Sequence, residues 1–230
     1  DGALREGLLY DMLGRLHHDD AREISIRAMQ RRYHVDDEQA ARVAATATLL
    51  LSKVAQPWGL EDPRYEQLLQ WAAALHEVGL AIAHSKYHQH GGYLLAHADM
   101  PGFVRLEQQL LATLVACHRR KLDNLTIDRL PPSWRGPIFK LVVLLRLAVL
   151  LNRGRGPVDL GSFDVATGTR RLCLNFSEDW YARNPLTEAD LLQEQAWLEP
   201  VAFELTGGSR RQSHEASASC PSNRLCAETA

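Results

Sequence analysis

The sequence predicts a mainly α-helical protein that ends in a small α/β annex. Apolar residues recur at helical spacing over most of residues 2–152, which indicates a helical bundle. After Asn152 the apolar period shortens towards two, as in strands. A linker-like stretch, Arg153-Gly-Arg-Gly-Pro157, separates the two patterns. We therefore expect a bundle of roughly six or seven helices followed by a small α/β domain.

Caps and helix breakers set the expected helices of the bundle. Asp36 is a good N-cap, Pro57 interrupts the pattern that follows it, and Pro63 suits the first turn of the next helix. Gly79 is a typical residue just beyond a helix end. The resulting helices have the approximate bounds 2–16, 19–34, 36–56, 63–79, 88–97, 103–119 and 138–152.

The annex is expected to contain a β-hairpin, one helix and a returning strand. Residues 163–166 and 171–176 alternate around a turn at Gly168. A helix over 187–198 and a strand over 201–205 follow. The rest of the chain is polar and lacks aromatic residues, which predicts disorder. The expected parts are a connecting helix (1–18), the helical domain (19–155), the small α/β domain (156–206) and a disordered tail (207–230).

Composition limits the partners of the chain. Its 26 basic and 28 acidic residues give a net charge of −2, so we expect neither nucleic acid nor a membrane surface as a general partner. The longest apolar run, 141–151, contains Arg146 and is too short for an integral membrane segment. The four cysteines show no disulfide or zinc spacing, which favours the cytoplasm. Because the chain begins with Asp1 and not Met, we expect it to be a fragment of a longer protein.

Histidines gather in the stretch around WAAALHEVGLAIAHSKYHQHGGYLL. His76 is followed directly by Glu77 at the end of an apolar helix, and His84, His88 and His90 come soon after. Imidazoles beside a carboxylate are typical of divalent-metal sites. Core and surface histidines are the commoner explanation of each residue taken singly.

The stretch ALHEVGL resembles the His-Asp segment of the helical phosphohydrolases of the HD superfamily, and the resemblance covers residues 36–152. The four metal-ligand positions of that superfamily fall on Gln39, His76, Glu77 and Val149. An amide is a weak metal ligand and valine has no donor atom. We therefore predict a degenerate HD scaffold with no bound metal and no catalytic residue. Gln39 also has a local explanation, because it stands three residues after the cap Asp36.

A basic trio, Arg119, Arg120 and Lys121, follows His118 directly. If these side chains share a groove with His76, the groove would suit a polyanion better than a metal ion. The alternative is a solvated helix end whose cations interact with the helix dipole.

Several segments together resemble the C-terminal half of the exopolyphosphatase/guanosine pentaphosphate phosphohydrolase (Ppx/GppA) family. They are GALREG, QAARV, QWAAALHEVGL, HSKYHQHGGYLL, LRLAVLLN and NFSEDWYARNPLTEADLLQEQ, and the match extends to about residue 206. The resemblance implies that an N-terminal actin-like half performs Mg²⁺-dependent catalysis, so that this region needs no cofactor and is inactive alone. It also implies a homodimer and a basic channel for inorganic polyphosphate, with residues 1–18 joining the two halves. The candidate polyphosphate-binding residues are then His76, His118, Arg119, Arg120, Lys121 and Arg5.

The favoured function is thus the C-terminal region of an exopolyphosphatase, and three alternatives stay open. The first is the equivalent region of a guanosine pentaphosphate phosphohydrolase. The second is an active HD phosphohydrolase that binds metal through His76, Glu77, His90 and His118. The third is a dimerisation module with no ligand.

Overall fold

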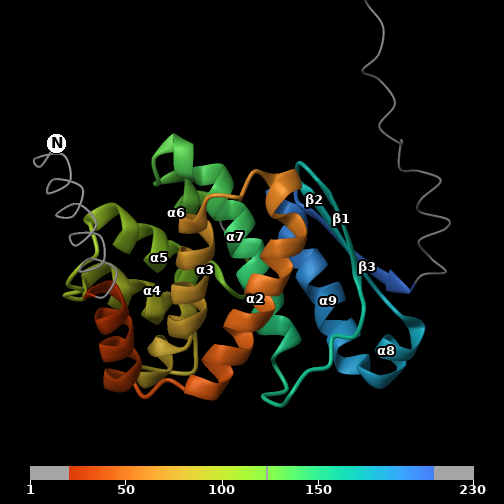
Figure 1. Cartoon of the computed structure of the whole chain (residues 1–230), viewed down its shortest axis with the longest axis horizontal. Coiled ribbons are helices and arrows are strands. Elements are labelled where there is room, and N and C mark those ends of the chain that lie inside the picture. The colour runs from red at the N-terminus through yellow and green to blue at the C-terminus, as the bar shows by residue number, and fades with distance from the viewer. Residues whose placement is uncertain (1–20, 123, 210–230) are drawn as a thin grey trace, which may run out of the picture. The chain divides into compact units, whose positions relative to one another are not determined.

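The computed structural model describes residues 21–122 and 124–209 (Figure 1). The expected connecting helix 1–18, with Arg5, and residues 210–230 lie outside the described residues. The chain divides into two compact units, one ending at Val158 and the other beginning at Asp159. The first is helical and the second combines helices with a three-stranded sheet, so the predicted fold class, mainly α with a small α/β part, is confirmed.

The first unit is a packed set of helices. Residues 21–32 are helical. The elements that follow are α2 (Asp37–Trp58), α3 (Pro63–Leu75), the 3₁₀ helix η1 (Val78–Ala81), α4 (Tyr87–His97), α5 (Arg105–Cys117), α6 (Asn124–Asp128) and α7 (Pro132–Leu151).

Local caps account for the helix boundaries. The carboxylate of Asp36 accepts a hydrogen bond from the Gln39 backbone N–H at the start of α2. At the start of α3, the carboxylate of Asp62 accepts one from the Arg64 backbone N–H. Helix α2 ends at Gly59, whose φ of 64° is a conformation that glycine adopts without strain. These boundaries follow from residues that can be identified in the sequence.

Helix α7 forms the centre of the first unit. Residues 141–148 are all buried, and α7 contacts α2, α3, α5 and α6. Figure 1 shows α2 and α3 side by side, and contacts between their residues confirm the pairing. A helix that is apolar on every side needs such surroundings, because each of its faces must be removed from water.

The structure corrects two helix boundaries and adds one short helix. Helix α7 begins at Pro132 and not at residue 138 as predicted, because proline is well tolerated in a first helical turn. The Trp134 N–H also donates to Pro131 O at 2.9 Å. Helix α3 ends at Leu75 and the chain tightens into η1, so the predicted end at Gly79 was late. The short helix α6 was not predicted, since five residues show no clear period.

Glycines allow α4 to approach its neighbours closely. A Cβ at Gly79 of η1 would lie 1.9 Å from the carbonyl oxygen of Tyr87. A Cβ at Gly92 of α4 would lie 2.6 Å from the Cβ of Ala116 in α5. Both distances are impossible for real side chains, so glycine is required where η1, α4 and α5 meet.

The second unit contains β1 (Asp164–Gly168), β2 (Arg171–Phe176), α8 (Glu178–Arg183), α9 (Pro185–Leu198), η2 (Glu199–Val201) and β3 (Glu204–Ser209). Strands β1 and β2 form the expected antiparallel hairpin, with Gly168 opposite Arg171. Strand β3 pairs in parallel with β2 through a crossover that includes α8 and α9.

Two features of the second unit differ from the sequence prediction. Helix α8 was not predicted, although Ser177 caps it by accepting a hydrogen bond from the Trp180 N–H. Strand β3 continues to Ser209, so residues 207–209 pair with β2 instead of beginning the predicted disordered tail. Along the described part of the chain, none of the helices combines the length and apolar character needed to cross a bilayer.

Candidate functional site

Three histidines from different helices meet inside the first unit. His76 caps the C-terminal end of α3, His118 caps that of α5, and His88 lies in the first turn of α4. The ring centroids of His76 and His118 are 5.6 Å apart, and those of His88 and His118 are 6.1 Å apart. The close packing of η1, α4 and α5 at their glycines brings these helix ends together.

His76 and His118 are buried and neutral. Each donates its Nδ1 proton to a carbonyl three residues earlier, at 2.7 Å to Ala73 and 2.6 Å to Val115. The Tyr87 hydroxyl donates to Nε2 of His118 at 3.4 Å. Burial lowers the pKa of His76 to about 4 and holds that of His118 well below its usual value. Neither side chain reaches solvent, since each is only 1% exposed.

Glu77 is a buried carboxylate paired with a cation from the end of the first unit. The Arg155 guanidinium bonds Oε1 of Glu77 with one nitrogen and Oδ2 of Asp36 with the other, the latter at 3.0 Å. Burial raises the pKa of Glu77, and the charge of Arg155 opposes that rise. Nε2 of His76 lies 4.0 Å from the same Glu77 oxygen. A guanidinium thus neutralises the carboxylate that an HD site would direct at a metal ion.

Gln39 and Val149 take structural positions in the first unit. Gln39 is buried, donates from Nε2 to Asn152 O at 2.8 Å and accepts from Arg42, so it ties α2 to the end of α7. Val149 is a half-buried residue of α7. Within residues 21–122 and 124–209, no three His, Cys, Asp or Glu side chains lie close enough to share a metal ion.

A hollow of about 380 Å³ opens beside the histidine cluster. We call it the basic hollow, because cations dominate its lining. It is lined by His84, Ser85, Lys86, His88, Gln89, Arg119, Arg120 and Lys121. One wall is the segment 84–89, which leads into the N-terminal turn of α4, and the other is the turn after α5. The N-terminus of a helix of this length adds a positive partial charge to the same hollow.

His88 is a buried residue in the lining of the basic hollow. It is 6% exposed, and its Nδ1 has no hydrogen-bond partner in the described part of the chain. Burial, followed by the charges of Arg119, Arg146 and Arg120, lowers the pKa of His88 to about 4. The Arg119 guanidinium also lies over the Tyr87 ring, 4.7 Å from its centroid. A ligand that brings negative charge would relieve this concentration of cations.

The structure brings together only part of the predicted binding set. Arg119, Arg120 and Lys121 do share one hollow. His76 and His118 are buried and do not line it, and Arg5 lies outside the described residues. The binding set predicted from the sequence included neither His88 nor Lys86, which both line the hollow. The one available signal was the four-residue spacing of His84 and His88 ahead of a helix.

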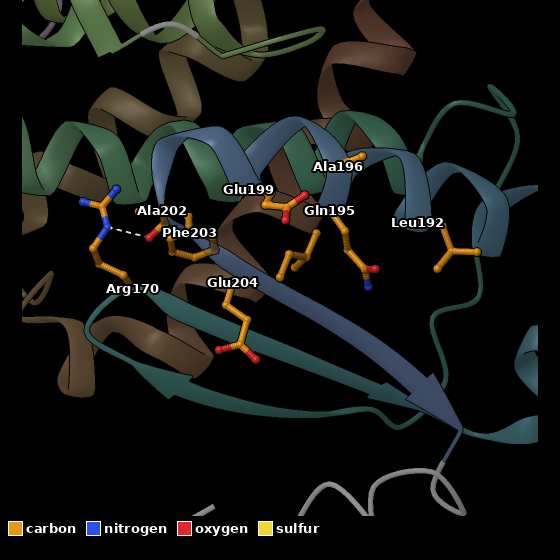
Figure 2. Close-up of a pocket in the computed structure, with 9 residues that line it drawn as sticks. Arg170, Leu192, Gln195, Ala196, Glu199, Ala202, Phe203 and Glu204 are labelled. Carbon is orange, nitrogen blue, oxygen red and sulfur yellow. Dashed lines mark hydrogen bonds between the residues drawn. The ribbon is translucent and has the colours of Figure 1, made fainter. Parts of the chain in front are cut away.

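A second, more open hollow of about 640 Å³ lies within the second unit. Figure 2 shows Arg170 at one end, Leu192 at the other and the carboxylates of Glu199 and Glu204 between them. Arg170 donates to the carbonyls of Val201 and Ala202, the latter at 2.8 Å. With two carboxylates in its lining, this hollow suits an anion less well than the basic hollow does.

Comparisons with known proteins agree on one family. A family model described as Ppx/GppA phosphatase, domain III, matches residues 21–195. The chain is 37% identical over 190 residues to a protein of Vibrio cholerae named guanosine-5′-triphosphate,3′-diphosphate pyrophosphatase, covering 83% of this chain and 38% of that protein. Proteins of the same name from Pseudoalteromonas translucida and Vibrio vulnificus are 38% and 36% identical, over 89% and 91% of this chain and 41% and 42% of their own lengths. The chain thus spans about two fifths of the length of these relatives.

Proposed function

Because this chain belongs to the Ppx/GppA phosphatase family and corresponds to a C-terminal region of it, we propose that it is part of an enzyme that hydrolyses guanosine 5′-triphosphate 3′-diphosphate. The names of its relatives favour this substrate over the inorganic polyphosphate expected from the sequence. Both compounds contain linked phosphate groups, so a site that binds either substrate would use the same binding chemistry.

Within this protein, we assign the described region to substrate binding. The observation that carries the assignment is the basic hollow, which Arg119, Arg120 and Lys121 line together with His88, a buried residue whose Nδ1 has no hydrogen-bond partner among the described residues. Guanidinium groups form paired hydrogen bonds with phosphate oxygens, and lysine adds a compact charge. The hollow holds one or two phosphate groups of the substrate, while the remaining part of the substrate extends into solvent.

Catalysis is assigned to a different part of the protein. At the HD-like positions the chain has an amide at Gln39, an apolar side chain at Val149 and a carboxylate at Glu77 that Arg155 already neutralises. Such a set offers little to a divalent metal ion that must activate water. The Mg²⁺ expected for the reaction therefore belongs to the other half of the protein, and the HD-like helices act as a scaffold.

Binding measurements on this chain test the proposal. Isothermal titration with guanosine 5′-triphosphate 3′-diphosphate, inorganic tripolyphosphate and long-chain polyphosphate should show binding of all three phosphate ligands and no phosphate release. The triple variant R119A/R120A/K121A should lose most of this affinity. Tighter binding of the guanosine compound than of tripolyphosphate would support the guanosine substrate, and the reverse order would support polyphosphate. Equal binding by the wild type and the triple variant would overturn the assignment of the hollow.

The homodimer implied by the family resemblance is also proposed for this protein. Leu186 and Leu192 of α9 are 82% and 58% exposed, and a subunit contact over α9 would cover them. Sedimentation equilibrium should give twice the chain mass for the wild type and a shift towards monomer for L186D/L192D. A monomeric wild type would exclude the dimer without affecting the phosphate-binding proposal.

A further inference from the structure

Arg146 is an unusual residue for its surroundings. It lies in the middle of α7, it is 2% exposed, and the residues on both sides of it in the chain are fully buried. Burying a charged side chain is costly unless hydrogen bonds compensate the lost hydration. The contacts that compensate Arg146 therefore indicate what the residue is for.

The guanidinium of Arg146 bridges two carbonyl groups at the end of α5. Nη1 donates to Cys117 O at 2.7 Å and Nη2 donates to Arg120 O at 2.5 Å. The last carbonyls of a helix have no partner within the helix and carry partial negative charge. Arg146 satisfies one of them and, through the second, holds the turn that follows the helix.

That turn is the wall of the basic hollow. It contains His118, Arg119, Arg120 and Lys121, and its two bridged carbonyls lie on either side of Arg119. Arg120 has a φ of 64°, a left-handed conformation that costs energy for any residue other than glycine and persists only where other contacts hold it. The bridge from Arg146 supplies such a contact from the core.

The charge of Arg146 also acts on His88, which lines the hollow. Among the groups that lower the pKa of His88, Arg146 of α7 acts together with Arg119 and Arg120 of the turn and His90 of α4. His118 packs against the His88 ring from the end of α5, and Tyr87 lies edge-on to it from α4. Because Arg146 is buried and acts on a residue that lines the hollow, its permanent charge is screened little by solvent and adds to the attraction of an anion there.

We propose that Arg146 is a positioning residue of the basic hollow, which holds the Arg119–Lys121 turn in its binding conformation and adds a buried positive charge that acts on His88. This inference rests on the proposed phosphate-binding function. It requires no contact between Arg146 and the ligand.

Two substitutions separate the geometric and electrostatic contributions. Arg146→Lys keeps the charge and cannot bridge both carbonyls in the same way, so it should weaken tripolyphosphate binding about tenfold while leaving the salt dependence unchanged. Arg146→Met removes both contributions, so it should weaken binding further and should raise the pKa of His88 in NMR titration. If the Met variant does not fold, the Lys variant carries the test, because its ammonium group can still donate to a carbonyl.

Lys140 provides the matched control on the same helix. Its Nζ donates to Trp58 O at 2.8 Å, away from the basic hollow, so it is another α7 cation that bonds a backbone carbonyl. Lys140→Met should leave the tripolyphosphate affinity and the His88 titration unchanged even if it lowers stability. Wild-type affinity in a folded Arg146→Lys or Arg146→Met variant would overturn the inference. Absence of binding by the wild type would instead overturn the proposed function.

Discussion

At the scale of single residues, burial decides the properties of this site more than residue type does. Three imidazoles are kept neutral by burial, and one carboxylate is kept inside by a guanidinium that comes from more than seventy residues away in the chain. The three imidazoles and the carboxylate each titrate differently in the folded and unfolded states, so each makes stability depend on pH.

Acid should destabilise the protein steeply. The pKa values of His76 and His88 fall from 6.5 to about 4 on folding, and that of His118 also falls, so the unfolded state binds more protons below pH 6.5. The stability present above pH 6.5 is therefore lost as pH falls towards 4, by up to about 1.4 kcal/mol per pH unit for each histidine. Urea unfolding across this range should show the loss.

Variants assign the acid effect to particular groups. His88→Asn should make stability fall less steeply with pH, because it removes a buried imidazole whose pKa is lowered on folding. Glu77 acts in the opposite direction, because its pKa is raised on folding and its contribution is lost as pH rises. Glu77→Gln should therefore steepen the acid loss. An unchanged slope in His88→Asn would contradict the account.

Removing Arg155 should expose the cost of the buried Glu77 carboxylate. Arg155→Ala leaves this side chain, which is 9% exposed, without its ion pair, so the free energy of unfolding at pH 7 should fall by roughly 1–3 kcal/mol. The double variant R155A/E77Q should recover much of that loss, since no charge is then buried. Arg64→Ala, which breaks the solvent-exposed pair with Asp62, should have a much smaller effect on stability, because water screens that pair. Equal effects at the two arginines would refute this account of Arg155.

At the scale of elements, the site depends on how closely η1, α4 and α5 approach one another. Gly79 and Gly92 stand at the two contacts, and the basic hollow lies at the same end of α4 as Gly79. The backbone spacing between these elements positions His88 next to the turn after α5. A side chain at either glycine would separate the elements that form the site.

Alanine at these glycines should therefore be costly. Gly79→Ala places a methyl group 1.9 Å from a backbone oxygen, so we expect a loss of about 3 kcal/mol or misfolding of the region, measured by thermal or urea unfolding. Gly136→Ala is the control, because it lies within α7 and a Cβ there meets nothing within 4 Å. That substitution should cost far less than Gly79→Ala, because the added methyl group has no neighbouring atom to displace. Similar losses at both positions would rule out close packing as the reason for Gly79.

At the scale of the whole molecule, the net charge of the chain differs from the local charge of the basic hollow. The net charge of −2 implies no overall attraction to polyanions, so the proposed phosphate binding requires a local concentration of cations such as the basic hollow. The chain also spans only about two fifths of its relatives' length, which makes binding, and not turnover, the appropriate measurement on this region.

Phosphate binding should depend on salt through the cations of the hollow. With three cationic contacts, the logarithm of the affinity for tripolyphosphate should fall with the logarithm of salt concentration with a slope of about −2. R119A/R120A/K121A should abolish this dependence along with binding. R27A/R31A/R32A removes the same charge from exposed positions in the helical segment 21–32 and should change neither quantity. An equal loss in both triple variants would mean that net charge, and not the hollow, attracts the ligand.

Much of the fold could be predicted from the sequence, because its determinants are local. Asp36, Pro63 and Gly59 mark helix ends through contacts within a few residues of themselves, and the apolar period of α7 predicts a central helix. The errors fell where local signals are weak or ambiguous, as at Pro132, which starts a helix as readily as it ends one.

The sequence by itself determined the family, the helical bundle with its α/β annex, and the missing donors at Gln39 and Val149, because each depends on residue types in a fixed order along the chain. Only the tertiary structure decided that His76 and His118 are buried, that Arg155 neutralises Glu77, and that Arg146 holds the turn beside His88. The physical reason is that burial and ion pairing depend on which distant segments meet. The packing of whole helices determines the contacts between distant segments, and residues adjacent in sequence do not.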